Sequence, residues 1–169
     1  RITAMLTRVA LALVWLLRLL PLALLVPLGR GLGILLYLLG RERRKVALTN
    51  LALCVPQWSE AERRRGVRKH FQAFGRNLLE HGILWWSSKE QVQRLVRMEG
   101  IEHWQAVAGR PVIFLAPHFI GLDMGGIRIG AEHQVVSVYS RQKDPAFDAV
   151  LYLGRTRFVM PELFSRQEG

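Results

Sequence analysis

The sequence predicts an α/β protein that begins with membrane-associated helices, and three observations lead to that fold class. Residues 9–39 are largely apolar. Residues 59–84 show the apolar spacing of an amphipathic helix. From about residue 95 onward, short runs of β-forming residues alternate with helical segments, and this alternation is typical of a sheet covered by helices.

The chain has 169 residues, which is enough for one domain. Its composition limits the classes of partner that it can be expected to bind. Half of the residues are hydrophobic (50%), and the formal net charge is +11. Soluble domains rarely combine the two properties, which together favour an anionic membrane surface, phosphorylated lipid, nucleic acid or an acidic carrier protein. The single cysteine, Cys54, excludes an internal disulfide, and we expect it to be a small buried residue.

Two apolar helices are expected in the first forty residues, at about 4–20 and 28–40. Pro21 and Pro27 interrupt the apolar run, because proline lacks the amide hydrogen that a helix interior needs. Nearly every residue from 11 to 17 is apolar, so no polar face remains for water. We therefore expect insertion in or on a bilayer rather than packing in a soluble core. A mostly basic cluster follows directly and consists of Arg41, Glu42, Arg43, Arg44 and Lys45. Such a cluster next to an apolar segment is typical of the cytoplasmic side of a membrane, where it binds anionic lipid.

A long amphipathic helix is expected over residues 59–84. Ser59 can cap its first turn, where Glu60 and Glu62 suit the positive end of the helix dipole. Its expected apolar stripe consists of Val67, Phe71, Phe74 and Leu78. Its basic residues form either a solvated face or a contact with headgroups or an acidic carrier; they are Arg63, Arg64, Arg65, Arg68 and Lys69.

The rest of the chain is expected to alternate between strands and helices. The expected strands, rich in β-branched and aromatic residues, lie at about 95–98, 112–115 and 135–139. The expected helices lie at about 101–108, 122–130 and 146–157. The glycines of this region do not match the spacing of nucleotide-binding loops.

The candidate site lies directly after the expected strand over residues 112–115. Ala116 and Pro117 end that strand, His118 follows, and Asp123 lies five positions further on. Within one continuous helix this spacing is a rotation of roughly 140°, so the two side chains meet only if His118 lies in a turn and Asp123 in the first turn of the next helix. Asp123 would then orient the imidazole, which would accept a proton from a hydroxyl as a general base. A chance pair is the alternative, because the spacing alone is a weak pattern.

Several sequence blocks in a fixed order carry a resemblance to a known family. They are the leucine-rich start, Arg43-Arg44, residues 50–56, 60–63, 98–102 and 112–123, Tyr139, and residues 144–148 and 154–158. With these blocks, which span nearly the whole chain, the sequence resembles the bacterial lipid A late acyltransferases, the Kdo-dependent lauroyl and myristoyl transferases of lipopolysaccharide synthesis.

The resemblance implies that His118 is the catalytic base, that Asp123 is its acidic partner and that Arg155 is a third functional residue. Without it, Arg155 would be interpreted as a solvated helix charge. The resemblance also implies an acyl-carrier-protein thioester as donor and a hydroxyl of a lipid A precursor as acceptor, at the cytoplasmic side of the bacterial inner membrane, with anionic membrane lipid as a further partner. No cofactor, metal or covalent acyl-enzyme is required.

We therefore expect a membrane-anchoring helical segment over residues 1–42 and the N-terminal part of an acyltransferase-type α/β domain over residues 43–169. The domain is expected to be truncated at the C-terminus, because the family continues with a second acidic motif and more sheet. One alternative is an acyltransferase for another lipid, such as a glycerophospholipid or a phosphatidylinositol mannoside. Another is a non-catalytic basic membrane-binding fragment. Nucleic acid is not expected as a partner, because the charges flank apolar helices and no recognition motif is present.

Overall fold

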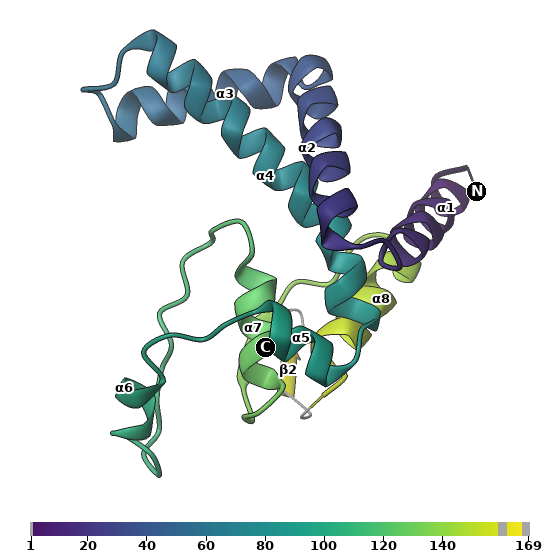
Figure 1. Ribbon diagram of the computed structural model, residues 1–169, viewed down its shortest axis with the longest axis vertical. Helices are drawn as coiled ribbons and strands as arrows, with labels where there is room; N and C mark the ends of the chain where they lie inside the picture. Colours follow the sequence, from purple (N-terminus) through teal and green to yellow (C-terminus); the bar gives the residue numbers. More distant parts are fainter. Residues whose placement is uncertain (1, 159–161, 167–169) are drawn as a thin grey trace. The chain divides into compact units, whose positions relative to one another are not determined.

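The computed structural model describes residues 2–158 and 162–166, and over these residues the chain is mostly helical with one small parallel sheet (Figure 1). The α/β prediction is therefore confirmed only in part. The chain divides into two compact units. One unit is residues 10–83, and the other combines residues 1–9 with residues 84–169.

The unit of residues 10–83 is built from helices alone within the described residues. These helices are α1 (Ile2–Leu17), whose last turns belong to this unit, α2 (Leu22–Leu39), α3 (Arg41–Cys54) and most of α4 (Glu60–Trp86). The predicted break at Pro21 is confirmed, because α2 begins directly after it. The predicted break at Pro27 is wrong, since Pro27 lies inside α2. A proline there removes one hydrogen bond in the second turn, and α2 nevertheless continues through it to Leu39.

The first turn of α4 is capped as the sequence predicts. The Ser59 amide donates to Glu62 Oε2 at 2.7 Å, and the Ser59 hydroxyl accepts from the Glu62 amide at 3.3 Å. This reciprocal pair is a capping box, which satisfies two backbone donors that a helix start otherwise leaves unpaired.

The apolar stripe of α4 departs from the prediction in its second half. Val67 and Phe71 are buried as expected, whereas Phe74 and Leu78 are exposed. The buried line continues instead through every fourth residue, at Gly75, Leu79 and Ile83. The cause is α2, which approaches α4 at Gly75 and so selects the face that becomes buried.

Helices α2 and α4 cross (Figure 1), and glycines of both helices lie at the contact. A Cβ atom on Gly33 would lie 2.2 Å from the Phe71 carbonyl oxygen, and one on Gly75 would lie 2.4 Å from the Gly33 nitrogen. Gly29 is as close, with a Cβ there 2.5 Å from the Arg76 Cα. These positions need glycine because no side chain fits between the two backbones. A small core adjoins the crossing and consists of Leu17, Leu25, Leu32, Leu79 and Ile83.

Two further features of this unit concern α2 and α3. Among the described residues, α2 alone is long and apolar enough to cross a membrane, judged by length and composition, and Ala4–Leu17 is a shorter apolar helix. Cys54, expected to be buried, is exposed at the end of α3. The turn after α3 packs Trp58 rather than Cys54 against Gly66 of α4.

The second unit contains the parallel sheet. Its elements are α5 (Lys89–Leu95), α6 (Ile101–Gln105), α7 (Leu122–Gly130), β1 (Val136–Tyr139), α8 (Pro145–Thr156) and β2 (Glu162–Ser165). Strands β1 and β2 pair in parallel, with Val136 opposite Glu162 and Tyr139 opposite Ser165. Helix α8 connects the two strands, as a parallel pair requires. The predicted strand at 135–139 and the predicted helices at 122–130 and 146–157 are therefore confirmed as β1, α7 and α8.

Two of the predicted strands are absent from the described residues. Leu95 is the last residue of α5, and residues 96–98 form no strand. Residues 112–115 are extended but pair with no described strand, and Ile113 and Leu115 are 98% and 96% exposed. A strand is held by hydrogen bonds to a neighbour, so β-forming residues alone do not produce one. The helix predicted at 101–108 is present but ends at Gln105.

Candidate active site

Asp123 lies in the first turn of α7, as predicted. Gly121 directly before the helix has a φ of +93°, a value that favours glycine, and its carbonyl accepts from the Met124 amide at 2.9 Å. Upstream, the Phe119 amide donates to the Pro117 carbonyl at 2.7 Å. The predicted order of a turn followed by a helix that begins just before Asp123 is therefore confirmed.

Arg155 lies in the last turn of α8 and reaches Asp123. Its Nη2 atom donates to Asp123 Oδ1 at 2.7 Å. The two side chains are only 28% and 21% exposed, so water screens this ion pair less than one at the open surface. Two of the three predicted site residues thus meet, although 32 positions separate them in the sequence.

His118 lies apart from this pair in the structure. It belongs to the exposed stretch of residues 111–120, and its side chain makes no hydrogen bond or ion pair with any other described residue. The expected hydrogen bond between His118 and Asp123 is therefore not formed here.

The position of Arg155 depends on how α8 packs. Leu151 and Gly154 form the buried side of α8. Gly154 lies against the indole of Trp85, since a Cβ atom there would be 2.2 Å from Trp85 Cδ1. The absence of a side chain at Gly154 lets the helix approach Trp85 closely, and Arg155 is the next residue. Trp85 is itself buried.

The start of α8 is fixed by Asp144. Its Oδ1 atom accepts from the amides of Ala146 and Phe147 at 3.0 and 3.1 Å, and its Oδ2 atom accepts from the Thr7 hydroxyl at 2.9 Å. The Phe147 amide, followed by the Thr7 hydroxyl, holds the pKa of the Asp144 carboxyl below its usual value. Asp144 therefore acts as the N-cap of the helix that carries Arg155.

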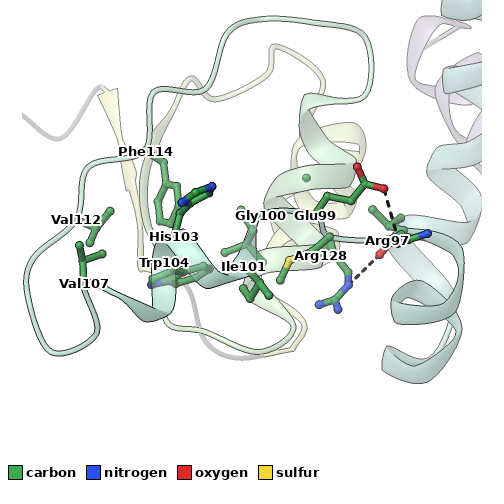
Figure 2. A pocket seen from close by; sticks show the side chains of 14 residues that line it. Arg97, Glu99, Gly100, Ile101, His103, Trp104, Val107, Val112, Phe114 and Arg128 are labelled. Carbon is green, nitrogen blue, oxygen red and sulfur yellow. Dashed lines mark hydrogen bonds and ion pairs between the residues drawn. The ribbon is translucent and has the colours of Figure 1, made fainter.

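A pocket of about 420 Å³ adjoins α7 on the side of residues 96–114 (Figure 2). Gly125, Arg128 and Ile129 of α7 line it, and Figure 2 shows Trp104, Phe114 and Val107 grouped away from Arg128. Its remaining lining is Val96, Arg97, Met98, Glu99, Gly100, Ile101, His103 and Val112. The pocket is mostly apolar, and it lies on the helix that carries Asp123.

Arg128 is held at the edge of this pocket by two contacts. Its Nε atom donates to the Val96 carbonyl at 3.0 Å, and its Nη1 atom lies 3.0 Å from Glu132 Oε2. Within the described residues, no group of three or more His, Cys, Asp and Glu side chains is arranged to hold a metal ion.

Comparison with known proteins identifies the family. The family described as "Bacterial lipid A biosynthesis acyltransferase" matches residues 2–168. The chain belongs to this family. It is 32% identical over 154 residues to the Lipid A biosynthesis lauroyltransferase of Escherichia coli (strain K12), covering 90% of this chain and 50% of that protein. It is 29% identical over 154 residues to the Lipid A biosynthesis palmitoleoyltransferase of the same strain, with the same coverage of 90% and 50%.

A third relative is named for a different acyl group. The Lipid A biosynthesis myristoyltransferase of Escherichia coli (strain K12) is 32% identical over 148 residues, which are 86% of this chain and 44% of that protein. The chain spans about half the length of the curated relatives that it matches. No solved structure matches the chain. The family resemblance read from the sequence blocks is thus confirmed.

Sequence reasoning missed the residues that position the candidate site. The contact between Gly154 and Trp85 went unnoticed because the two residues are far apart in sequence. Arg157, whose guanidinium donates to the Ser87 carbonyl, was missed for the same reason. The sequence contains only a weak signal of the pocket, namely the aromatic residues Trp104 and Phe114 in a segment expected to form a short helix and a strand. In the structure their rings meet edge to face, with centroids 5.0 Å apart.

Proposed function

We propose that the full-length protein transfers a fatty acyl chain from an acyl-carrier-protein thioester to a hydroxyl of a lipid A precursor. Membership of the lipid A biosynthesis acyltransferase family supports the reaction class. The observation that carries the site is the ion pair between Asp123 and Arg155, which joins two residues of the predicted site from separate helices. The reaction takes place at the cytoplasmic side of the inner membrane, where acyl carrier protein is found.

The chain contributes two parts to this enzyme under the proposal. Residues 1–42 form the membrane-anchoring segment, and the basic residues that follow bind anionic lipid. Residues 43–169 are the N-terminal part of an acyltransferase-type α/β domain. The β1-α8-β2 unit supports this assignment, because it is the kind of parallel unit from which such a sheet is built.

The proposed chemistry uses His118 as the general base. One ring nitrogen takes the proton of the acceptor hydroxyl while the oxygen attacks the thioester carbonyl carbon. A C–O bond forms and the C–S bond breaks, and the proton passes from the imidazolium to the departing thiolate. The amides of the first turn of α7 are suitable donors for the oxyanion that develops during attack.

Asp123 orients His118 in this mechanism, and Arg155 orients Asp123. A carboxylate has about four acceptor positions on its two oxygens, so it can hold a guanidinium and an imidazole together. Residues 117–121 form the turn that brings His118 toward Asp123 when the acceptor lipid is bound. Arg155 is thus a positioning residue that also places a positive charge near the anionic substrate.

The test of the base is His118→Ala in the full-length enzyme. General-base catalysis is worth roughly 10²–10⁴-fold, so transfer from acyl-carrier-protein thioester to lipid A precursor should fall by that factor while precursor binding is retained. His70→Ala is the matched control, because His70 is an exposed histidine of α4 in the other unit. Transfer by His118→Ala at the rate of the His70→Ala control would rule out the proposed base.

The pocket beside α7 is proposed to hold part of the acyl chain, because its lining is mostly apolar. A Cβ atom on Gly125 would meet nothing within 4 Å, so Gly125→Leu should project into the pocket and still fold. We expect this variant to lose transfer of long acyl chains more than of short ones, measured with a series of acyl-carrier-protein thioesters. Gly126→Leu is the matched control, since Gly126 also has open space but does not line the pocket. If transfer by both variants depended on acyl-chain length in the same way, the acyl chain would lie outside this pocket.

A further inference from the structure

We infer that α2 lies in the plane of one leaflet of an anionic bilayer, with α4 on its water side, and does not cross the membrane. The length and composition of α2 would allow a span. The neighbours of α2 argue against one, and they belong to the same compact unit. The inference goes beyond the proposed reaction and does not depend on it.

The first argument is the charge carried by α4 at the middle of α2. Gly29 lies one to two residues from the centre of Leu22–Leu39, and it touches the backbone of Arg76. The Arg76 side chain pairs with Glu80 at 2.5 Å and remains 44% exposed. If α2 crossed a bilayer, this exposed guanidinium would lie near the midplane of the hydrocarbon, where a charge is costly and usually shielded by protein.

The second argument is that lipid cannot separate the two helices. The backbones meet at Gly29, Gly33 and Gly75 with no room for a side chain. The whole of α4 at this level, including Gln72 beside Gly33, therefore moves with α2 into any environment that α2 enters. A polar helix fixed to one side of an apolar helix gives the pair one apolar face and one polar face.

The third argument is the position of the exposed leucines of α2. Leu24, Leu28, Leu35 and Leu38 are 50–60% exposed. At 100° per residue they lie roughly 120–160° around the helix from the line through Gly29 and Gly33, which faces α4. They therefore form one continuous apolar stripe, here called the leucine stripe, on the side of α2 away from α4.

The charges beside the leucine stripe identify its occupant as an anionic bilayer surface. Arg30 is exposed on the flank of α2, where its side chain can reach headgroups when the leucine stripe is in the acyl region. Arg41, Arg43 and Lys45 are exposed directly after α2, and Arg44 folds back over the Tyr37 ring. An apolar helix face edged by basic residues fits anionic lipid and not an acidic protein, which offers no hydrocarbon of this extent.

Depth measurements on the full-length chain test this orientation. In a Cys54→Ser background, single cysteines replace Leu24, Leu28, Leu35 or Leu38 and are spin-labelled in vesicles of phosphatidylethanolamine and phosphatidylglycerol. Collision with oxygen and with a nickel complex reports the depth of each label. We expect the same depth at all four positions, since an in-plane helix keeps its stripe level. A label at Lys69, exposed on α4, should remain accessible to nickel.

A span would give a different pattern. Leu28 and Leu38 would then be separated by roughly 15 Å along the membrane normal, and Leu28 would be much the deeper. A second measurement uses an impermeant maleimide with Leu19→Cys and Arg41→Cys, which flank α2. Labelling of both from one side supports the in-plane helix, and labelling from opposite sides overturns it. Spin–spin broadening without oxygen accessibility would mean that a second copy of the chain covers the stripe, which also overturns the inference.

Discussion

At the residue scale, the candidate site divides into what local sequence can predict and what it cannot. Pro117 and the helix expected from residue 122 predict a turn followed by a helix start, and the structure has both. Arg155 carries no local signal, and the family resemblance alone indicated it. Its contact with Asp123 depends on how α8 packs beside α7, and a contact across 32 residues is not encoded in the neighbourhood of either partner.

The pair between Asp123 and Arg155 predicts an asymmetry between arginine and lysine. Arg155→Lys keeps the charge but replaces a planar, forked donor with a single ammonium that cannot reproduce its geometry. A hydrogen bond to a charged group is worth about 1.5–3 kcal/mol, so we expect a loss of roughly tenfold to a hundredfold in the rate of acyl transfer by the full-length enzyme.

Arg110→Lys is the matched control for this substitution. Arg110 is exposed in the same unit, and its side chain makes no hydrogen bond, ion pair or ring contact with the described residues. Arg157 is unsuitable, because its guanidinium binds the Ser87 carbonyl. If Arg155→Lys were as active as Arg110→Lys, the ion pair would have no part in positioning the site.

At the element scale, the start of a helix was predictable where the sequence contains a capping residue. Ser59 and Glu62 mark the start of α4, and Asp144 before Pro145 marks the start of α8. The conformation of residues 112–115 could not be predicted in the same way, because a strand needs a partner that its own residues do not specify. The buried face of α4 was misjudged for a related reason, since Gly75 looks unremarkable until Gly33 of another helix lies against it.

Two helical glycines should respond in opposite ways to the same substitution. Alanine in a helix interior is usually more stable than glycine by about 0.5–1 kcal/mol, and Gly126→Ala should gain this much because nothing lies within 4 Å of its Cβ position. Gly154→Ala should lose about 1–3 kcal/mol, because its Cβ would overlap the Trp85 ring. Thermal unfolding of the full-length protein in detergent measures both effects.

The same pair of variants also reports on the site. Gly154→Ala moves α8 away from Trp85 and therefore displaces Arg155, so acyl transfer should fall at temperatures where the protein is still folded. Gly126→Ala should leave the rate unchanged. A stabilising effect of Gly154→Ala would show that α8 does not rest on Trp85 as closely as the structure has it.

At the scale of the whole molecule, the excess of basic residues and the apolar start of the chain both favour association with an anionic membrane. Composition alone predicted an anionic partner and a membrane-seeking segment, and the family is membrane-associated. Composition could not say which side of α2 meets lipid, because this follows from the contact with α4. The basic face of α4 was left open between solvent, headgroups and an acidic carrier, and no contact in the described residues assigns it a partner outside the chain.

Salt separates the two forces that hold the protein on the membrane. Replacing Arg41, Arg43 and Lys45 by Gln removes about 1 kcal/mol of lipid attraction per residue, so binding to anionic vesicles should weaken roughly a hundredfold at low salt and hardly change at high salt. Replacing Leu24 and Leu35 by Gln removes apolar burial of about 1.5–3 kcal/mol each and should release the full-length protein at both salt concentrations. Sedimentation with vesicles measures the bound fraction. The matched control replaces Arg65, Arg68 and Lys69 of α4 by Gln. An equal loss in this control would mean that the basic face of α4 also contacts headgroups, and unchanged binding of the leucine variant at high salt would mean that α2 is not the anchor.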